Sequence, residues 1–171
     1  VSNGATLTVE DNSFAIEALG ALSAGTSGTI VLEPLTNGTP FGLTGTAGAL
    51  PFTANTLVLG SLTAGPVTIS NDVNLSGVAV LDVLSGAAIA EAGGTTLMVG
   101  ALEGNGASAS FTATNSITTL AGFSTSRGFT LSNAADLTVA GPLTDTSAAG
   151  VSLNVAGALT LAGNVSAPSI N

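Results

Sequence analysis

The sequence has no cysteine, histidine, lysine, tryptophan or tyrosine, and Arg127 is its single basic residue. Without cysteine, disulfides, thiolate nucleophiles and Cys-ligated zinc are excluded. Without histidine or lysine, a serine nucleophile has only carboxylates to activate it. Neutralising nucleic-acid phosphates takes several Lys or Arg side chains, so a chain of net charge −9 does not bind nucleic acid or anionic lipid electrostatically.

Charge of either sign is scarce. Charged residues make up 6% of the chain, where a soluble domain carries about a quarter. The surface must therefore consist of hydroxyls, amides and backbone, and weak mutual repulsion favours self-association. Although the mean hydropathy is +0.63, no apolar run approaches the roughly 18 residues of a spanning helix, so we predict no membrane span.

A length of 171 residues suits a single domain, 1–171, and a repeat runs along it. A small-residue step beside leucine recurs at intervals of forty residues, and later copies lie 22, 19 and 16 residues apart. We interpret the longer period as two rungs of about twenty residues. The steps at the longer spacing are Gly20-Ala21-Leu22, Gly60-Ser61-Leu62 and Gly100-Ala101-Leu102.

Within each rung, apolar and hydroxyl residues alternate, which is the side-chain period of a β-strand. Helical propensity is confined to 87–92, which Gly93-Gly94 ends. The alternating segments include Leu7-Thr8-Val9, Val67-Thr68-Ile69 and Phe129-Thr130-Leu131. Turn signals separate them at Asn37-Gly38, Asn71-Asp72, Gly93-Gly94, Gly104-Asn105-Gly106 and Ser132-Asn133.

These patterns predict an all-β fold, a right-handed parallel β-helix (solenoid) with rungs of about 20 residues. One such rung is a turn of a three-faced coil, and the chain provides about eight or nine of them. Inward Leu, Val, Ile and Phe would stack into columns, with Gly and Ala at the corners. The alternative is a propeller that uses one forty-residue repeat for each blade.

Two late segments carry a family resemblance. Residues 137–143 (LTVAGPL) and 150–165 (GVSLNVAGALTLAGNV) resemble the β-helical repeats of filamentous-haemagglutinin-like exoproteins and related bacterial surface proteins. The resemblance implies a secreted Gram-negative protein, located extracellularly at the bacterial cell surface, with a long right-handed β-helix used in adhesion, biofilm or surface filaments. It transfers no functional residue.

The acidic residues show no spacing locked to the repeat, and adjacent strand residues such as Glu10 and Asp11 face opposite ways. We therefore predict solubilising or terminal roles for them, with a cation site as the alternative. The acids are Glu10, Asp11, Glu17, Glu33, Asp72, Asp82, Glu91, Glu103, Asp136 and Asp145.

The other candidates have structural interpretations. Arg127, between Ser126 and Gly128, is typical of a turn residue or an ion-pair partner. The only aromatics are expected to stack in the core: Phe14, Phe41, Phe52, Phe111, Phe123 and Phe129. Thr-x-Thr pairs, which an ice-binding face needs on successive rungs, occur without regular spacing at Thr6/Thr8, Thr44/Thr46, Thr112/Thr114 and Thr144/Thr146.

We therefore assign no catalytic, cofactor-binding or metal-binding residue and predict no cofactor. The sequence predicts a non-enzymatic extracellular structural protein, a bacterial surface filament or adhesin module that self-associates by solenoid stacking. Its expected partners are further copies of itself and cell-surface or matrix glycans. The alternatives are a glycan-active or glycan-binding β-helix of tailspike or lyase type and an ice-binding solenoid.

Overall fold

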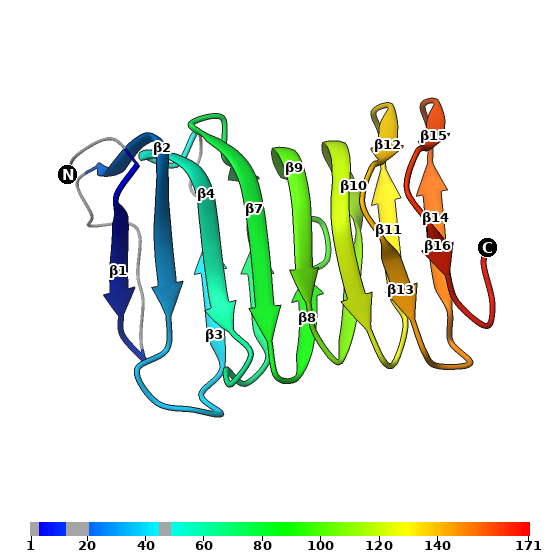
Figure 1. The fold of residues 1–171 in the computed structure, drawn as a ribbon, viewed down its shortest axis with the longest axis horizontal. Helices are drawn as coiled ribbons and strands as arrows, with labels where there is room; N and C mark the ends of the chain where they lie inside the picture. The colour runs from blue at the N-terminus through cyan, green and yellow to red at the C-terminus, as the bar shows by residue number, and fades with distance from the viewer. Residues whose placement is uncertain (1–3, 13–20, 45–48) are drawn as a thin grey trace.

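A computed structural model describes residues 4–12, 21–44 and 49–171, and all its regular elements are β-strands (Figure 1). Every pairing between strands is parallel, so the predicted parallel β-solenoid is confirmed. The described residues contain no helix long and apolar enough to cross a membrane. The strands are β1 (Thr6–Glu10), β2 (Leu22–Glu33), β3 (Phe41–Thr44), β4 (Phe52–Ser61), β5 (Val67–Ser70), β6 (Val73–Asn74), β7 (Val78–Ser85), β8 (Ala88–Glu91), β9 (Leu97–Asn105), β10 (Ser108–Thr125), β11 (Phe129–Asn133), β12 (Leu137–Val139), β13 (Leu143–Asp145), β14 (Val151–Val155), β15 (Leu159–Leu161) and β16 (Val165–Ser166).

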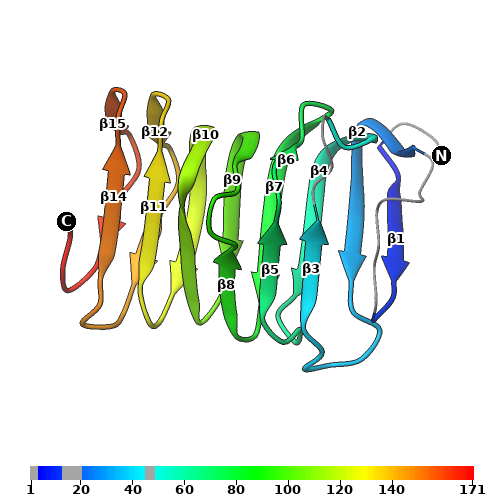
Figure 2. The ribbon, with the colours of Figure 1, turned by 180° about the vertical axis from the view of Figure 1, so that it is seen from behind.

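The coil has a front face and a back face. The front face contains β1, β2, β4, β7 and β9, followed by the second half of β10, and it lies toward the viewer in Figure 1. The back face, seen in Figure 2, contains β3, β5, β8, the first half of β10, β11 and β14. The last two turns each hold three short strands, β11 to β13 and β14 to β16, as a three-faced coil requires.

Inward aliphatic side chains form a column along the whole front face. Its members occupy equivalent positions in successive strands, and the five central ones from Ile30 to Leu120 are fully buried. Burying one such side chain contributes about 1.5–3 kcal/mol, so the column is a main source of stability. The column is Leu7, Ile30, Leu57, Leu81, Leu102, Leu120, Val139 and Leu161.

Phenylalanine fills the core where the aliphatic columns leave space. The rings of Phe111, Phe123 and Phe129 lie within 5.0–6.3 Å of one another, centroid to centroid. Phe123 stands over Gly104, where a Cβ would lie 2.8 Å from the ring. With Phe41 and Phe52 also buried, the predicted core role is confirmed for five phenylalanines. Phe14 lies outside the described residues.

The turns have about the predicted length, but they are fewer and less even than the sequence predicted. They number about seven, at roughly 22 residues each, instead of eight or nine. Pairing of Ala109 with Phe129 spans 20 residues, whereas pairing of Leu22 with Phe52 spans 30. Insertions in the first third of the chain, which the leucine and glycine pattern does not reveal, account for the difference.

The predicted repeat of forty residues was wrong, although the predicted rung of about twenty residues was confirmed. Leu57 stacks on Leu81 and then on Leu102, so two turns take 45 residues there. Gly100 lies within β9 and not at a corner. Gly60, at φ +82°, lies near the end of β4 and pairs with Leu84, so in the coil it is equivalent to Asn105 and not to Gly100.

Three predicted turn signals are confirmed by backbone angles in the left-handed region. Asn71 has φ 59°, Gly94 has φ 79° and Gly38 has φ 75°. Residues 87–92, the only stretch with helical propensity, contain strand β8. Stacking within the coil therefore overrides the local alanine-rich composition.

Candidate functional site

The acidic side chains do not all play the predicted solubilising role. Glu10 and Asp11 are exposed at the N-terminal end. Glu91 and Asp145 are only 8% and 3% exposed, so the prediction is wrong for these two. Arg127 is exposed in the bend between β10 and β11. Glu17 lies outside the described residues.

Asp145 organises the corner that follows β13. Its carboxylate accepts hydrogen bonds from the Thr125 hydroxyl (2.9 Å), the Gly128 N–H (2.7 Å), and the N–H and hydroxyl of Ser147 (both 2.8 Å). Desolvation by burial alone raises the pKa of Asp145, but the bonds from Ser147, Gly128 and Thr125 outweigh it, so the pKa lies below the ordinary 3.8. The carboxylate is a structural acceptor that ties two turns together.

A second buried polar cluster lies where the back-face strands end. Asn115 and Asn133 stack on each other, and their Oδ1 atoms each accept a backbone N–H at 2.8 Å, from Leu97 and Ile117 respectively. The Asn115 amide donates to Glu91 Oε2 at 3.0 Å, while Glu91 Oε1 has no partner among the described residues. The two asparagine side chains therefore accept hydrogen bonds from buried backbone N–H groups at the corner.

Among the described residues, carboxylates are directly paired across the front face at two places, Glu10 with Glu33 and Asp82 with Glu103. Asp82 on β7 and Glu103 on β9 are directly paired across adjacent strands of the front face. Desolvation by burial, and then the charge of Glu103, raise the pKa of Asp82 to about 6. Neither Asp82 nor Glu103 lines the corner groove described below, and the described residues hold no group of three or more potential metal ligands. The pair is an electrostatic feature of an open face.

Threonines form a column on the outside of the front face that the sequence did not reveal. Six of its eight positions are threonine, all at least partly exposed. Of the predicted Thr-x-Thr pairs, only Thr6 belongs to it, and Thr46 lies outside the described residues. Turns of uneven length hid the column from the sequence, because its successive members lie 18 to 27 residues apart. The column is Thr6, Thr29, Thr56, Val80, Ala101, Thr119, Thr138 and Thr160.

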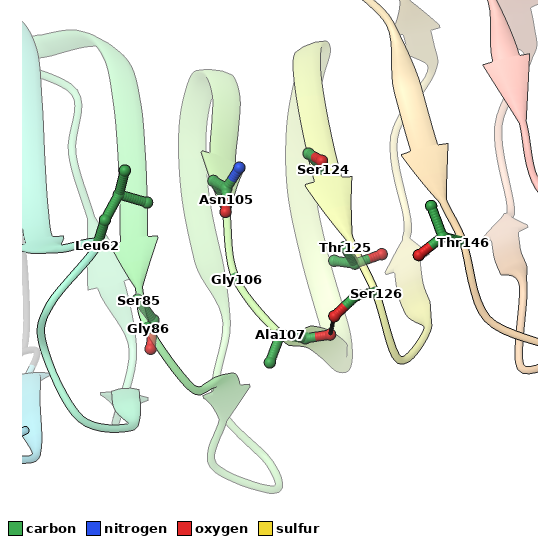
Figure 3. Close-up of a pocket in the computed structure, with 10 residues that line it drawn as sticks. All are labelled: Leu62, Ser85, Gly86, Asn105, Gly106, Ala107, Ser124, Thr125, Ser126 and Thr146. Atoms are coloured by element: carbon green, nitrogen blue, oxygen red, sulfur yellow. Dashed lines mark hydrogen bonds between the residues drawn. The ribbon is translucent and has the colours of Figure 1, made fainter.

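A shallow groove of about 380 Å³ runs along the corner where the front-face strands end (Figure 3). Successive turns contribute residues at equivalent positions, since Asn105 pairs with Leu84 on one side and Ser124 on the other. No lining residue is charged. The lining residues are Leu62, Ser85, Gly86, Asn105, Gly106, Ala107, Ser124, Thr125, Ser126 and Thr146.

Some polar side chains of the groove already make hydrogen bonds within the protein, and others do not. The Ser85 hydroxyl donates to Gly65 C=O at 2.9 Å, and the Thr125 hydroxyl is bound to Asp145. The exposed side chains of Asn105 and Thr146 make no hydrogen bond to another described residue. The groove therefore presents an amide and a hydroxyl to a ligand.

Comparisons with protein-family models, with curated proteins and with solved structures find no match to this chain. Strand pairing alone therefore defines the class of the protein, a parallel β-solenoid. The resemblance to filamentous-haemagglutinin-like repeats stays a prediction.

Proposed function

We propose that this chain is a non-enzymatic structural module of the bacterial cell surface, and that it self-associates by stacking its turns end to end into filaments. Copies joined in this way extend one continuous parallel sheet. The module acts as a scaffold or adhesin, and its chemistry is that of an uncharged, repetitive surface.

The C-terminal turn carries this proposal. Leu159 and Leu161 point inward at positions equivalent to Leu137 and Val139, which are 1% and 0% exposed, yet they are themselves 44% and 59% exposed. The described residues place no strand on the outer side of β15 or β16. A further turn stacked there would bury the leucines and pair the free backbone groups.

The charges at the two ends favour head-to-tail contact between copies. Residues 146–171 contain no charged side chain, whereas β1 at the other end carries Glu10 and is followed by Asp11. Joining two N-terminal ends would place like charges together, but joining a C-terminal end to an N-terminal end would not. Such a heterologous contact does not close on itself, so it builds an open filament.

Sedimentation velocity over a concentration series tests the proposal. The unmodified chain should form long species, and Leu159→Lys should remain monomeric because a lysine at this edge opposes pairing. Met98→Lys is the matched control, since Met98 is also 44% exposed but lies on β9 within the coil. A monomeric unmodified chain, or undiminished assembly of Leu159→Lys, would contradict the proposal.

Ice binding is the second candidate, and the threonine column favours it. A flat parallel sheet repeats its outward hydroxyl and methyl groups at the strand spacing of about 4.8 Å, which provides an ordered template for water. A thermal-hysteresis measurement should then show a freezing gap that Thr138→Lys reduces. Thr112→Lys, at an exposed threonine outside the column, should leave the gap unchanged. Absence of a gap rules this candidate out.

A further inference from the structure

The corner groove is uncharged and is lined by residues of several successive turns. We propose that it binds an extended neutral glycan chain lying parallel to the solenoid axis. This inference deepens the proposed adhesive role by naming a class of ligand. It rests on the proposed filament only for the increase in affinity that several linked copies provide.

The direction of the groove follows from the register of the coil. Asn105 and Ser124 line the groove from paired positions on neighbouring strands. Ser85 and Thr146 line it from the turns on either side, so the groove crosses successive turns along the coil. Polar groups therefore recur at the strand spacing of about 4.8 Å. A pyranose unit of an extended chain advances by about one turn, so successive sugars would meet successive turns of the groove.

The floor of the groove is bare because the corner excludes side chains. A Cβ on Gly86 would lie 2.7 Å from Leu62 C=O, and one on Gly106 would lie 2.8 Å from Ile89 Cδ1. With Ala107, these residues leave a floor of backbone and small side chains, and Leu62, 59% exposed, adds an apolar side chain. Such a surface suits the C–H face of a sugar ring.

The walls provide hydrogen bonds that suit hydroxyl groups. The Asn105 amide both donates and accepts, and so does the Thr146 hydroxyl. Ser126 binds Ala107 C=O only at 3.4 Å, which leaves its hydroxyl available for a shorter bond (Figure 3). Sugar hydroxyls, which also donate and accept, complement all three side chains.

The charge of the molecule selects a neutral ligand. No residue of the groove is charged, and a net charge of −9 repels acidic polysaccharides. The groove has no aromatic side chain on which a sugar could stack, so a single site should bind with a dissociation constant in the millimolar range. Several copies in one filament would bind a long glycan more tightly through multivalency. Binding should be insensitive to salt, because no ion pair forms.

The test is an NMR titration with cellohexaose, a neutral glucan, and with hexagalacturonate as an anionic comparison. It uses the Leu159→Lys variant, so that the groove is measured without assembly. Cellohexaose should shift the backbone amides of 105–107 and 124–126 at millimolar concentration, equally in low and high salt. Hexagalacturonate should not shift them.

Variants of the groove separate specific binding from general surface contact. Asn105→Ala and Thr146→Val should each weaken cellohexaose binding about five-fold, and Ala107→Leu should block it by filling the floor. Asn55→Ala, at an exposed asparagine on β4 outside the groove, should bind normally. No shift at the groove, or equal binding by all variants, overturns the glycan site. Assembly measured by sedimentation is unaffected by that result, so the two proposals fail separately.

Discussion

Replacing Asp82 by asparagine should stabilise the protein near neutral pH. Asp82 is about half-buried beside Glu103, and desolvation followed by the Glu103 charge raises the pKa of Asp82 from 3.8 to about 6. At pH 7 the folded state therefore holds a carboxylate in unfavourable surroundings. The amide removes the charge while keeping the shape of the side chain.

The sign and size of the effect follow from the two pKa values. Because the folded state binds the proton more tightly, unfolding free energy rises as pH falls through about 6, and the gain is complete near 3.8. At about 1.4 kcal/mol for each pH unit the full effect is about 3 kcal/mol, and solvent screening of a half-exposed group reduces it to about 1 kcal/mol.

Urea unfolding at pH 7 and pH 4.5 measures this effect. At pH 7, Asp82→Asn should raise the unfolding free energy by about 1 kcal/mol, and at pH 4.5 the difference from the unmodified chain should fall to less than half of that value. Glu10→Gln, at an exposed carboxylate on β1 opposite Glu33, changes the net charge equally and should show a smaller effect, because the Glu10 side chain is not buried. A destabilised Asp82→Asn variant at pH 7, or a flat pH profile for the unmodified chain, would refute the reasoning.

Other substitutions test the buried polar groups and the close corners by the same urea assay. Asp145→Asn should lower the unfolding free energy by about 1–3 kcal/mol, because an amide cannot accept all four hydrogen bonds. In the unmodified chain, the stability that the Asp145 carboxylate contributes should be lost only as pH falls below 3.8. An unchanged urea midpoint for the variant would contradict the structural role of Asp145. Asn133→Ala should cost about 2 kcal/mol because it strands a buried N–H, and a neutral result would show that water replaces the amide. Gly141→Ala should lower the unfolding free energy by more than about 3 kcal/mol, because its Cβ would overlap the Ala121 carbonyl oxygen of the preceding turn. Gly93→Ala, whose Cβ would meet open space, should leave the unfolding free energy unchanged. Equal effects of the two substitutions would disprove the close stacking.

Much of the fold could be predicted because one alternation repeats in every turn. Leu7-Thr8-Val9 and Val67-Thr68-Ile69 both lie in strands whose leucine, valine and isoleucine side chains point inward. The register could not be predicted, because a corner accepts inserted residues without changing the strands beside it. Gly100 matches Gly60 in sequence, but in the coil Gly60 is equivalent to Asn105, five residues further along the chain.

The candidate site was largely beyond prediction from sequence. Asn133 was expected only as a turn signal, yet its buried side chain replaces two hydrogen bonds of the sheet. Asn105 and Thr146 lie forty-one residues apart and share a groove only because two turns separate them. Local sequence shows which side of a strand a residue faces, but proximity across turns depends on every intervening corner.

Fibre diffraction from the assembled protein tests the central claim most directly, because it reports the direction of the strands relative to the long axis of the filament. Stacked turns predict a reflection near 4.8 Å along the filament axis, continuous from one copy to the next. Leu159→Lys should yield no oriented fibre. A strong 4.8 Å reflection perpendicular to that axis, or discrete particles at every concentration, would contradict end-to-end stacking of the solenoid.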